Sequence, residues 1–222
     1  MAFLQNRLNT YDTLVTAITG WLARPDDPTD PVLAAIPDYI RLCEARLNTE
    51  LRGQVNQRRS WAYINEPVEG LPTDFLAPSH VSLVQADDRA YSLTPMSVRE
   101  LRDRYSYAGS PCAYAIAGPQ IMFGPYVEYD VDAVETELSR FEIVYFAEIP
   151  PLTDPEVDTN DVLLKHPDLY LMGSLVEAGS FTVSDQTPMW ESRFKSALDK
   201  ANLAGMDAIL GGATVAPPDN VV

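Results

Sequence analysis

Residues 36–51 read Ile-Pro-Asp-Tyr-Ile-Arg-Leu-Cys-Glu-Ala-Arg-Leu-Asn-Thr-Glu-Leu, and this stretch decides the class of fold. The proline in its second position suits the first turn of a helix. Apolar residues recur at the spacing of one helical face, while acids and bases alternate on the other face, which suits solvent or a partner. We therefore predict an amphipathic helix, which we expect to continue as a basic helix over Arg41–Arg59. Its apolar positions are Ile36, Ile40, Cys43, Leu47 and Leu51, and its charged positions are Arg41, Glu44, Arg46, Glu50 and Arg52.

The same helical period appears closer to the N-terminus. Thr10 suits the N-cap position, and the run Arg24–Pro28, rich in proline and aspartate, ends the pattern. We predict a helix between these two points. Its apolar positions are Tyr11, Leu14, Val15, Ile18, Trp21 and Leu22.

Two more helices are predicted in the C-terminal part of the chain. Pro167 begins the first of them, and Gly173 and Gly179 on its apolar face indicate the close approach of a neighbouring helix. Thr187 and Pro188 begin the second. The apolar positions are Leu171, Met172, Leu175, Val176 and Ala178 in the first, and Trp190, Phe194, Ala197, Leu198 and Ala201 in the second.

Between the helical segments the period changes to that of strands. Trp61 and Tyr63 alternate with small or polar residues, and Leu71–Phe75 has the composition of a turn that enters a strand. Residues 80–84 and 91–93 flank a turn and predict a hairpin.

The rest of the middle segment continues this pattern. Thr94–Pro95 is expected to cap and begin a short helix that ends at about Tyr105. Residues 113–117 and 121–123 predict a second hairpin, and Leu138–Phe146 is the longest and best strand pattern. The middle of the chain is therefore predicted to be a small antiparallel sheet with one helix let into it.

The order of elements predicts an α+β fold that is mainly helical. We expect a helical core of two N-terminal and two or more C-terminal helices, with a small antiparallel β insertion in the middle. Because neither helical pair is a full bundle, the pairs should pack together as one core, with the sheet projecting from it. We predict one domain over residues 1–210, with helices at about 10–57 and 161–204, a β-rich insertion at about 59–148, a linker at Pro150–Asp161 and a flexible tail at 211–222.

The charge balance excludes several classes of partner. The 222 residues carry 16 lysines and arginines against 32 aspartates and glutamates, a formal net charge of −16. That charge argues against nonspecific nucleic-acid binding, which needs clustered cations, and against docking on an anionic membrane. Tyr105–Val127 carries no charge, but its prolines and glycines would break a membrane-spanning helix. Because Met1–Arg7 lacks the apolar segment of a signal peptide, we expect a soluble protein made in a cytoplasm.

Negative charge is concentrated in the second half of the chain. Residues 1–110 hold 11 basic and 14 acidic residues, whereas residues 111–222 hold 5 and 18. The run Glu128–Asp161 contains eleven carboxylates and a single cation, Arg140. Such a run is either a solvated loop or a fixed acidic surface that faces a basic partner or repels a passing polyanion.

The sequence contains no recognisable catalytic constellation. Cys43 and Cys112 are too few and too far apart for a disulfide framework or a zinc site, and the usual phosphate-binding and nucleophile motifs are missing. Asp130, Asp132 and Glu135 resemble the start of a calcium loop, but the required glycine and bidentate glutamate are absent. We therefore predict that the protein is not an enzyme and has no catalytic, cofactor-binding or metal-binding residues and no cofactor.

His166-Pro167-Asp168 is the signature tripeptide of J-domain cochaperones. In that family it follows a strongly basic helix, whereas Asn160–Lys165 contains one cation. A Pro-Asp pair in the first turn of a helix explains the tripeptide better, because aspartate favours the positive end of the helix dipole.

A further set of short segments is ordered along nearly the whole chain, from about Thr10 to Ala204. The segments are Ile36–Ile40 leading to Glu44–Leu47, Leu71–Phe75, Ala113–Gly118 with Ile121–Phe123, Phe141–Phe146 followed by Ile149–Leu152, His166–Leu171 with Glu177–Ala178, and Trp190 with Arg193–Phe194. In their order and spacing these segments resemble the head–tail connector proteins, or portal adaptors, of tailed bacteriophages.

The resemblance implies a structural virion protein at the head–tail interface, or neck, made in the bacterial host cytoplasm. Such adaptors form a twelve-subunit ring under the portal protein, extend the DNA channel and give tail or nozzle proteins a platform. The implied partners are therefore the portal protein, a tail or nozzle protein and further copies of this chain. DNA is expected to pass without specific binding, and no membrane is involved. We also expect part of Glu128–Asp161 to face the channel, and the tail at 211–222 to order against the portal or a neighbouring subunit.

Two alternatives stay open. One is another phage assembly protein, such as a tail terminator or a head-completion factor, and the other is an uncharacterised hydrolase built from scattered carboxylates. Oligomeric state separates the connector from a terminator, because terminators usually form six-subunit rings. A metal-dependent hydrolase activity that is lost on mutation of one carboxylate would indicate the enzyme.

Overall fold

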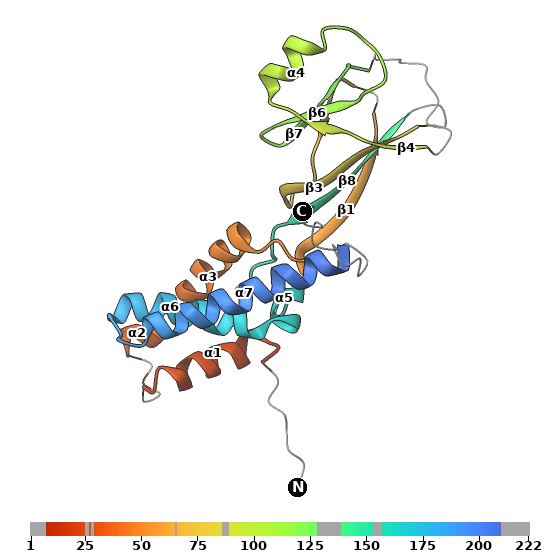
Figure 1. The fold of residues 1–222 in the computed structure, drawn as a ribbon. Coiled ribbons are helices and arrows are strands. Elements are labelled where there is room, and N and C mark those ends of the chain that lie inside the picture. Colours follow the sequence, from red (N-terminus) through yellow and green to blue (C-terminus); the bar gives the residue numbers. More distant parts are fainter. Residues whose placement is uncertain are drawn as a thin grey trace, which may run out of the picture. The chain divides into compact units, whose positions relative to one another are not determined.

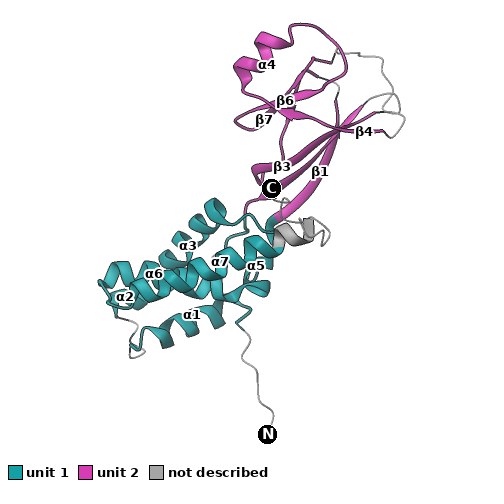
Figure 2. Cartoon of the chain, in the orientation of Figure 1, with its two compact units in different colours: residues 1–56, 149–222 teal, residues 57–148 magenta. Residues whose placement is uncertain are grey.

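The computed structural model describes residues 8–24, 27, 29–64, 66–85, 89–127, 139–152 and 157–209, with side chains through residue 204 (Figure 1). The chain divides into two compact units (Figure 2). The helical unit comprises Met1–Asn56 and Ile149–Val222, and the β unit comprises Gln57–Glu148. Both ends of the chain therefore build one unit, and the segment between them builds the other.

The observed class agrees with the predicted one, but the proportions differ. Helices account for 45% of the structure and strands for 26%, which confirms an α+β fold with more helix than strand. The strands form two four-stranded sheets, so the β part is larger than the small insertion that we predicted. The alternation of residues predicted individual strands, but it contained no information on how many sheets they would form.

In the described residues, the helical unit contains the four predicted helices and three short helical elements that we did not predict individually. α1 begins where predicted, because the hydroxyl of Thr10 accepts a hydrogen bond from the backbone N–H of Thr13 and the Thr13 hydroxyl accepts one from the N–H of Thr10. The described elements are α1 (Tyr11–Trp21), α2 (Pro31–Ala34), α3 (Ile36–Glu50), the 3-10 turn η1 (Gln54–Asn56), α5 (Asp161–Lys165), α6 (Pro167–Thr182) and α7 (Thr187–Ile209) (Figure 1).

α6 is the central helix of this unit and packs against α1, α2, α3, α5 and α7. A Cβ atom added at Gly173 would collide with the Cys43 sulfur and would lie 3.0 Å from the Phe194 ring, so the close helix approach predicted there is confirmed. Apolar side chains of α1, α3, α6 and α7 share a single buried cluster. The two helical pairs therefore form one core, as expected.

The prediction of a basic helix over Arg41–Arg59 is wrong. α3 ends at Glu50, and Leu51 has an extended backbone with ψ 120°. One distant and one local partner replace the helical hydrogen bonds here: the Arg52 N–H donates to the Asn202 side chain (2.8 Å), and the nearby Asn56 amide donates to the Leu51 carbonyl (3.2 Å). Gly53 packs closely against the α7 backbone. A Cβ atom added at this position would lie 3.0 Å from the Ala201 carbonyl oxygen.

The β unit contains two sheets. The first is fully antiparallel, in the order β1-β8-β3-β4, with the strands β1 (Gln57–Tyr63), β8 (Arg140–Ala147), β3 (Phe75–Val84) and β4 (Ala90–Ser92). The second has the order β2-β7-β6-β5, with β2 (Val68–Gly70), β7 (Gln120–Gly124), β6 (Ala113–Ala117) and β5 (Thr94–Pro95). The β5–β6 pair is parallel, so the prediction of a purely antiparallel β part is also corrected.

One apolar cluster joins the two sheets. Val81, Leu83, Phe141 and Ile143 of the first sheet and Ile121 and Phe123 of the second sheet belong to it. The register places Val81 opposite Ile143 and Leu83 opposite Phe141, so the buried positions of neighbouring strands coincide. A smaller cluster attaches α4 (Val98–Arg104) to β6 and β7 through Leu101.

Both predicted hairpins are confirmed, as β3–β4 and β6–β7. Two details differ. β3, with 10 residues, is longer than β8, with 8 residues. Thr94–Pro95 is a strand and not the start of a helix, because the Thr94 N–H donates to the Cys112 carbonyl and draws this segment into the second sheet. The α4 helix starts later, with Ser97 as its N-cap.

Candidate interaction surfaces

A buried polar network ties α3 to the chain around α5 and α6. The Glu44 carboxylate accepts hydrogen bonds from the Leu152 N–H (2.7 Å) and the Tyr170 hydroxyl (3.3 Å). The Asn160 amide donates to the Tyr170 oxygen (2.7 Å) and to the Pro150 carbonyl (2.9 Å), while its side-chain oxygen accepts the Leu163 N–H and caps α5. Each side chain of the network therefore fixes a different segment of the chain.

Burial raises the pKa of Glu44 and also that of Tyr170. A carboxylate and a tyrosine in contact resemble the acid–base pairs of active sites. Here Glu44 is 5% exposed and Tyr170 is fully buried, so a substrate cannot reach either group. The network is structural. The expectation that Glu44 belongs to a face for solvent or a partner is wrong, because Leu152 and Tyr170 provide hydrogen bonds for it inside the unit.

A second charged cluster fastens α3 to α7. Both terminal nitrogens of Arg46 donate to the Glu191 carboxylate, at 2.8 and 2.7 Å, and its Nε donates to Glu50 at 2.9 Å. The guanidinium also lies 4.3 Å from the centre of the Phe194 ring. The hydrogen bonds from Arg46 lower the pKa of Glu191 to about 2. Arg46 therefore forms its ion pairs within the helical unit. The expectation that it belongs to a face for solvent or a partner is wrong.

One face of the first sheet carries exposed aromatic and charged side chains. Arg59, Trp61 and Tyr63 alternate along β1 and so share a face, and the register places Glu142 opposite Trp61. Trp61 is 55% exposed, its ring meets Tyr63 edge-on at 5.5 Å, and the Arg140 guanidinium lies 5.8 Å from it. Exposed tryptophan, tyrosine and arginine are the residue types enriched at the centres of protein–protein contacts.

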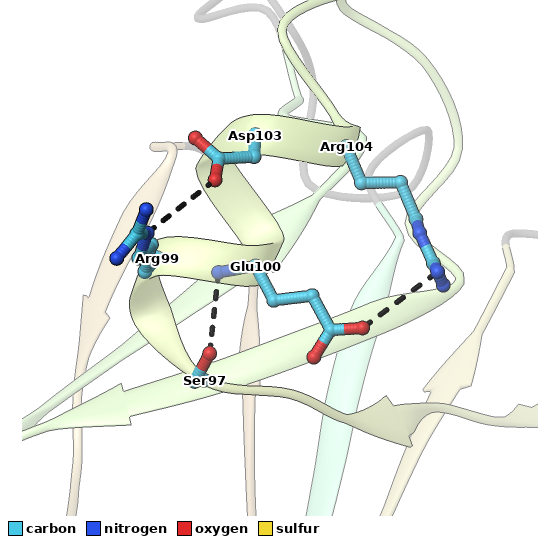
Figure 3. Close-up of a pocket in the computed structure, with 5 residues that line it drawn as sticks. All are labelled: Ser97, Arg99, Glu100, Asp103 and Arg104. Atoms are coloured by element: carbon cyan, nitrogen blue, oxygen red, sulfur yellow. Dashed lines mark hydrogen bonds and ion pairs between the residues drawn. The ribbon is translucent and has the colours of Figure 1, made fainter.

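A second exposed surface lies on α4 in the β unit. Figure 3 shows Arg99 directed at Asp103 (3.7 Å) and Arg104 directed at Glu100 (3.6 Å), around a shallow hollow of about 430 Å³. The Ser97 hydroxyl accepts the Glu100 N–H at 3.2 Å and begins the helix. Exposed pairs of this kind contribute little to folding, so these charges remain available to a partner.

The residues with metal-binding or nucleophilic side chains do not converge. Among the residues that the structure describes, no group of three or more histidine, cysteine, aspartate and glutamate side chains could hold a metal ion. His80 is exposed and its Nε2 lies 3.5 Å from the Ser92 hydroxyl. Cys43 is fully buried and burial raises its pKa to about 12, whereas Cys112 is exposed. Pro167 and Asp168 occupy the first turn of α6, as we predicted for the His166-Pro167-Asp168 tripeptide.

Only part of the acidic run Glu128–Asp161 can be located. Residues 128–138 and 153–156 lie outside the described residues, as does the predicted tail at 211–222. Glu142 forms ion pairs with Arg59 and Arg140 on the face of the first sheet. Its carboxylate is therefore neutralised locally and does not contribute to a purely acidic surface.

The arrangement defines an α+β protein that has exposed aromatic and charged surfaces and keeps its perturbed carboxylate–tyrosine pair inaccessible. More specifically, the chain belongs to the SU10 adaptor protein family, whose sequence model matches residues 9–217. The family consists of phage head–tail adaptors, which are structural rather than catalytic proteins. The resemblance found in the sequence is thereby confirmed.

Curated proteins gave no significant match to the chain. In the part of the chain that the structure describes, every helix is too short or too polar to cross a membrane.

Proposed function

We propose that the protein assembles as a ring of twelve subunits under the portal of a tailed phage, extends the DNA channel and carries the tail or nozzle proteins. The observation that carries the proposal is the family match over residues 9–217, which spans the helical unit and the β unit together. The two units then act as parts of one adaptor domain, over residues 1–210. The protein is a component of the virion neck.

The charge of the chain supports passage of DNA without binding. A net charge of −16 leaves phosphates few cations to contact, so DNA slides past the subunit. We assign part of the acidic run Glu128–Asp161 to the wall of the channel. The tail at 211–222 is assigned to contact with the portal or a neighbouring subunit. Truncation of the tail would then weaken binding to the portal.

The exposed side chains supply candidate contacts. The face of the first sheet around Trp61 and the charged surface of α4 lie in the β unit, whereas other exposed aromatic residues lie in the helical unit. Contacts to the portal and to the tail require at least two distinct surfaces per subunit. The fold offers surfaces of different chemistry, which suits an adaptor between two unlike partners.

The experiment is a light-scattering measurement of mass, first on the purified chain and then on its mixture with the portal protein of the same virus. Twelve copies bound per portal ring would support the proposal. A six-subunit ring without portal binding would instead indicate a tail terminator. A monomer in the absence of portal is compatible with the proposal, because ring proteins can assemble only on their template. No binding to portal rings at micromolar concentrations would overturn it.

A further inference from the structure

A hollow of about 300 Å³, here named the Trp21 hollow, lies at one end of the helical unit. It is found where α1 and α6 end and α7 begins. Its walls are residues 21–24 and the side chains of Thr182, Ser184, Gln186 and Trp190. The same chain segments hold four exposed large apolar residues: Trp21, Phe181, Val183 and Met189. Clustered exposed apolar groups with a polar rim mark a surface for a partner.

At the hollow, α6 ends in a left-handed residue that is not glycine, and the N–H groups of Val183 and Ser184 both donate to the Gly179 carbonyl. Val183 has φ 53° and ψ 49°, a left-handed conformation that crowds a β-branched side chain, at a position where glycine normally follows a helix. Its side chain is 88% exposed, so it adds little packing to offset that strain. Ala23, the other described non-glycine residue with positive φ, lines the same hollow. The left-handed conformation of Val183 therefore serves to end α6, and glycine would adopt it with less strain.

A buried polar group of a residue that lines the hollow lacks a hydrogen-bond partner in the described part of the chain. Trp190 is 2% exposed, and its indole N–H has no hydrogen-bond acceptor among the described residues. Buried donors are almost always paired in native structures, so each exception asks for an explanation. The edge of the hollow therefore combines strained backbone, exposed apolar side chains and an unsatisfied donor.

The other end of α6 has complementary chemistry. α5 lies there, away from the α6–α7 turn (Figure 1). Leu164 of α5 is 52% exposed, and the acids Asp161 and Asp168 are exposed on either side of it, with Lys165 as the nearby cation.

Two arginines lie at the rim of the Trp21 hollow. Arg193 lies 5.7 Å from the centre of the Trp21 ring and makes no ion pair with any described residue. Arg24 pairs with Asp30 at 2.8 Å, and Asp185 is the exposed acid of the α6–α7 turn. Arg193 is therefore the cation that is available to a carboxylate from outside.

We propose that Leu164 of one copy of this chain enters the Trp21 hollow of the next copy, with its flanking carboxylates facing Arg193. The inference rests on the adaptor function proposed above and names the lateral contact between subunits. Because the two surfaces lie at different ends of α6, the contact is heterologous, and its repetition builds a ring when the rotation between successive copies closes.

The test is a cross-linking experiment on the full chain, with Leu164→Cys and Val183→Cys combined in a Cys112→Ser background. Cys43 stays unreactive because it is buried and its pKa is raised to about 12. A short bismaleimide should convert the double variant into a ladder of covalent multimers. The matched control is an equal mixture of the two single-cysteine variants, which should stop at dimers of one copy of each.

The outcomes separate this contact from the adaptor function. If scattering shows an oligomer, alone or on portal rings, but the double variant gives no ladder, the contact is wrong and the adaptor function stands. Cross-links within either single variant alone would indicate a symmetric contact and would also overturn the inference. A chain that stays monomeric and does not cross-link, with or without portal rings, overturns both proposals.

Val183→Gly provides a second readout that does not depend on cross-linking. Glycine relieves the left-handed strain, so the melting temperature should rise by about 2–4 °C. The same change removes an exposed contact residue, so self-association should weaken at least tenfold. Unchanged self-association, or a fall in melting temperature, would overturn the role assigned to Val183.

Discussion

The helical unit is built from two remote segments of the chain, whereas the β unit is the single continuous segment Gln57–Glu148. In the helical unit Arg46 binds Glu191 across 145 residues of chain, and Glu44 binds Tyr170 across 126. The helical unit joins its two halves through polar bonds of defined geometry in addition to one apolar core. The β unit has an apolar cluster between its two sheets, and it has ion pairs on the face of the first sheet, around the partly buried Glu142, and on exposed α4. The polar bonds of the helical unit therefore join two remote parts of the chain, whereas the β unit joins the ends of one continuous segment by pairing β1 with β8.

The largest effect is expected when a core aromatic residue is truncated in either unit. Phe194→Ala should cost about 3–5 kcal/mol of folding free energy, because the ring is fully buried against α3 and α6. Hydrogen exchange followed by mass spectrometry should then show lost protection in α3, α6 and α7. The matched variant Phe141→Ala should remove protection from the strands instead. Equal loss of protection in both units from either variant would show that they unfold together.

The next largest effect is expected at the buried network. Glu44→Ala should cost about 2–3 kcal/mol in urea denaturation, because the Leu152 N–H and the Tyr170 hydroxyl lose their acceptor inside the protein. Glu44→Gln retains an acceptor oxygen and serves as the control, with a smaller loss. Equal losses for the two variants would mean that side-chain volume, and not hydrogen bonding, gives Glu44 its role.

The ion pair between α3 and α7 should show a dependence on pH. Arg46 lowers the folded-state pKa of Glu191 to about 2 from 4.5, so the carboxylate stabilises the fold above about pH 4.5 and loses that effect as the pH falls towards 2. Glu191→Gln should cost roughly 1–2 kcal/mol at pH 7, given the partial exposure of the pair.

The difference in urea stability between parent and Glu191→Gln, measured from pH 7 to pH 2.5, should shrink across that window. Glu44 provides a contrast of opposite sign: burial raises its pKa, so its ionised form costs stability at neutral pH and acid relieves that cost. If the stability lost in Glu191→Gln stayed constant with pH, the bond between Arg46 and residue 191 would not depend on the charge of the carboxylate.

The smallest effect is expected on α4. Asp103→Asn should change the folding free energy by less than about 0.5 kcal/mol, because the Arg99–Asp103 pair joins two exposed side chains of one helix at 3.7 Å. Thermal melts of this variant beside Glu191→Gln compare a local pair with one between distant helices. If Asp103→Asn lost as much thermal stability as Glu191→Gln, the difference described between the two units would be contradicted.

Local patterns in the sequence predicted the elements well where the signal lies within a few residues. The Thr10 cap, the first turn of α6 at Pro167 and the two hairpins were found because capping hydroxyls, prolines and alternating apolar residues act on their immediate neighbours. The same signals failed at Thr94–Pro95. That dipeptide has the composition of a helix start, but hydrogen bonds to β6 and its preceding residue outweigh the local preference.

The candidate surfaces were predictable only in part. Charge alternation on α3 indicated a polar face, yet it could not distinguish Arg41, which is exposed, from Glu44, which is buried. Nothing near Val183 in the sequence marks its left-handed conformation, because glycine is the usual signal for one. The Trp21 hollow was missed for a different reason. Its walls come from two segments more than 150 residues apart, and no local pattern indicates that they meet.

The amino-acid sequence by itself determined the α+β class, most helix starts, the hairpins, the acidic charge and the resemblance to phage adaptors. These properties follow from composition and from periods of two or 3.6 residues, which each segment carries alone. The tertiary structure decided where α3 ends, how the strands divide between two sheets, and which charges are buried. Those outcomes depend on partners such as Asn202, Tyr170 and Glu191, and a residue's burial is set by what packs against it rather than by its own neighbours in the chain.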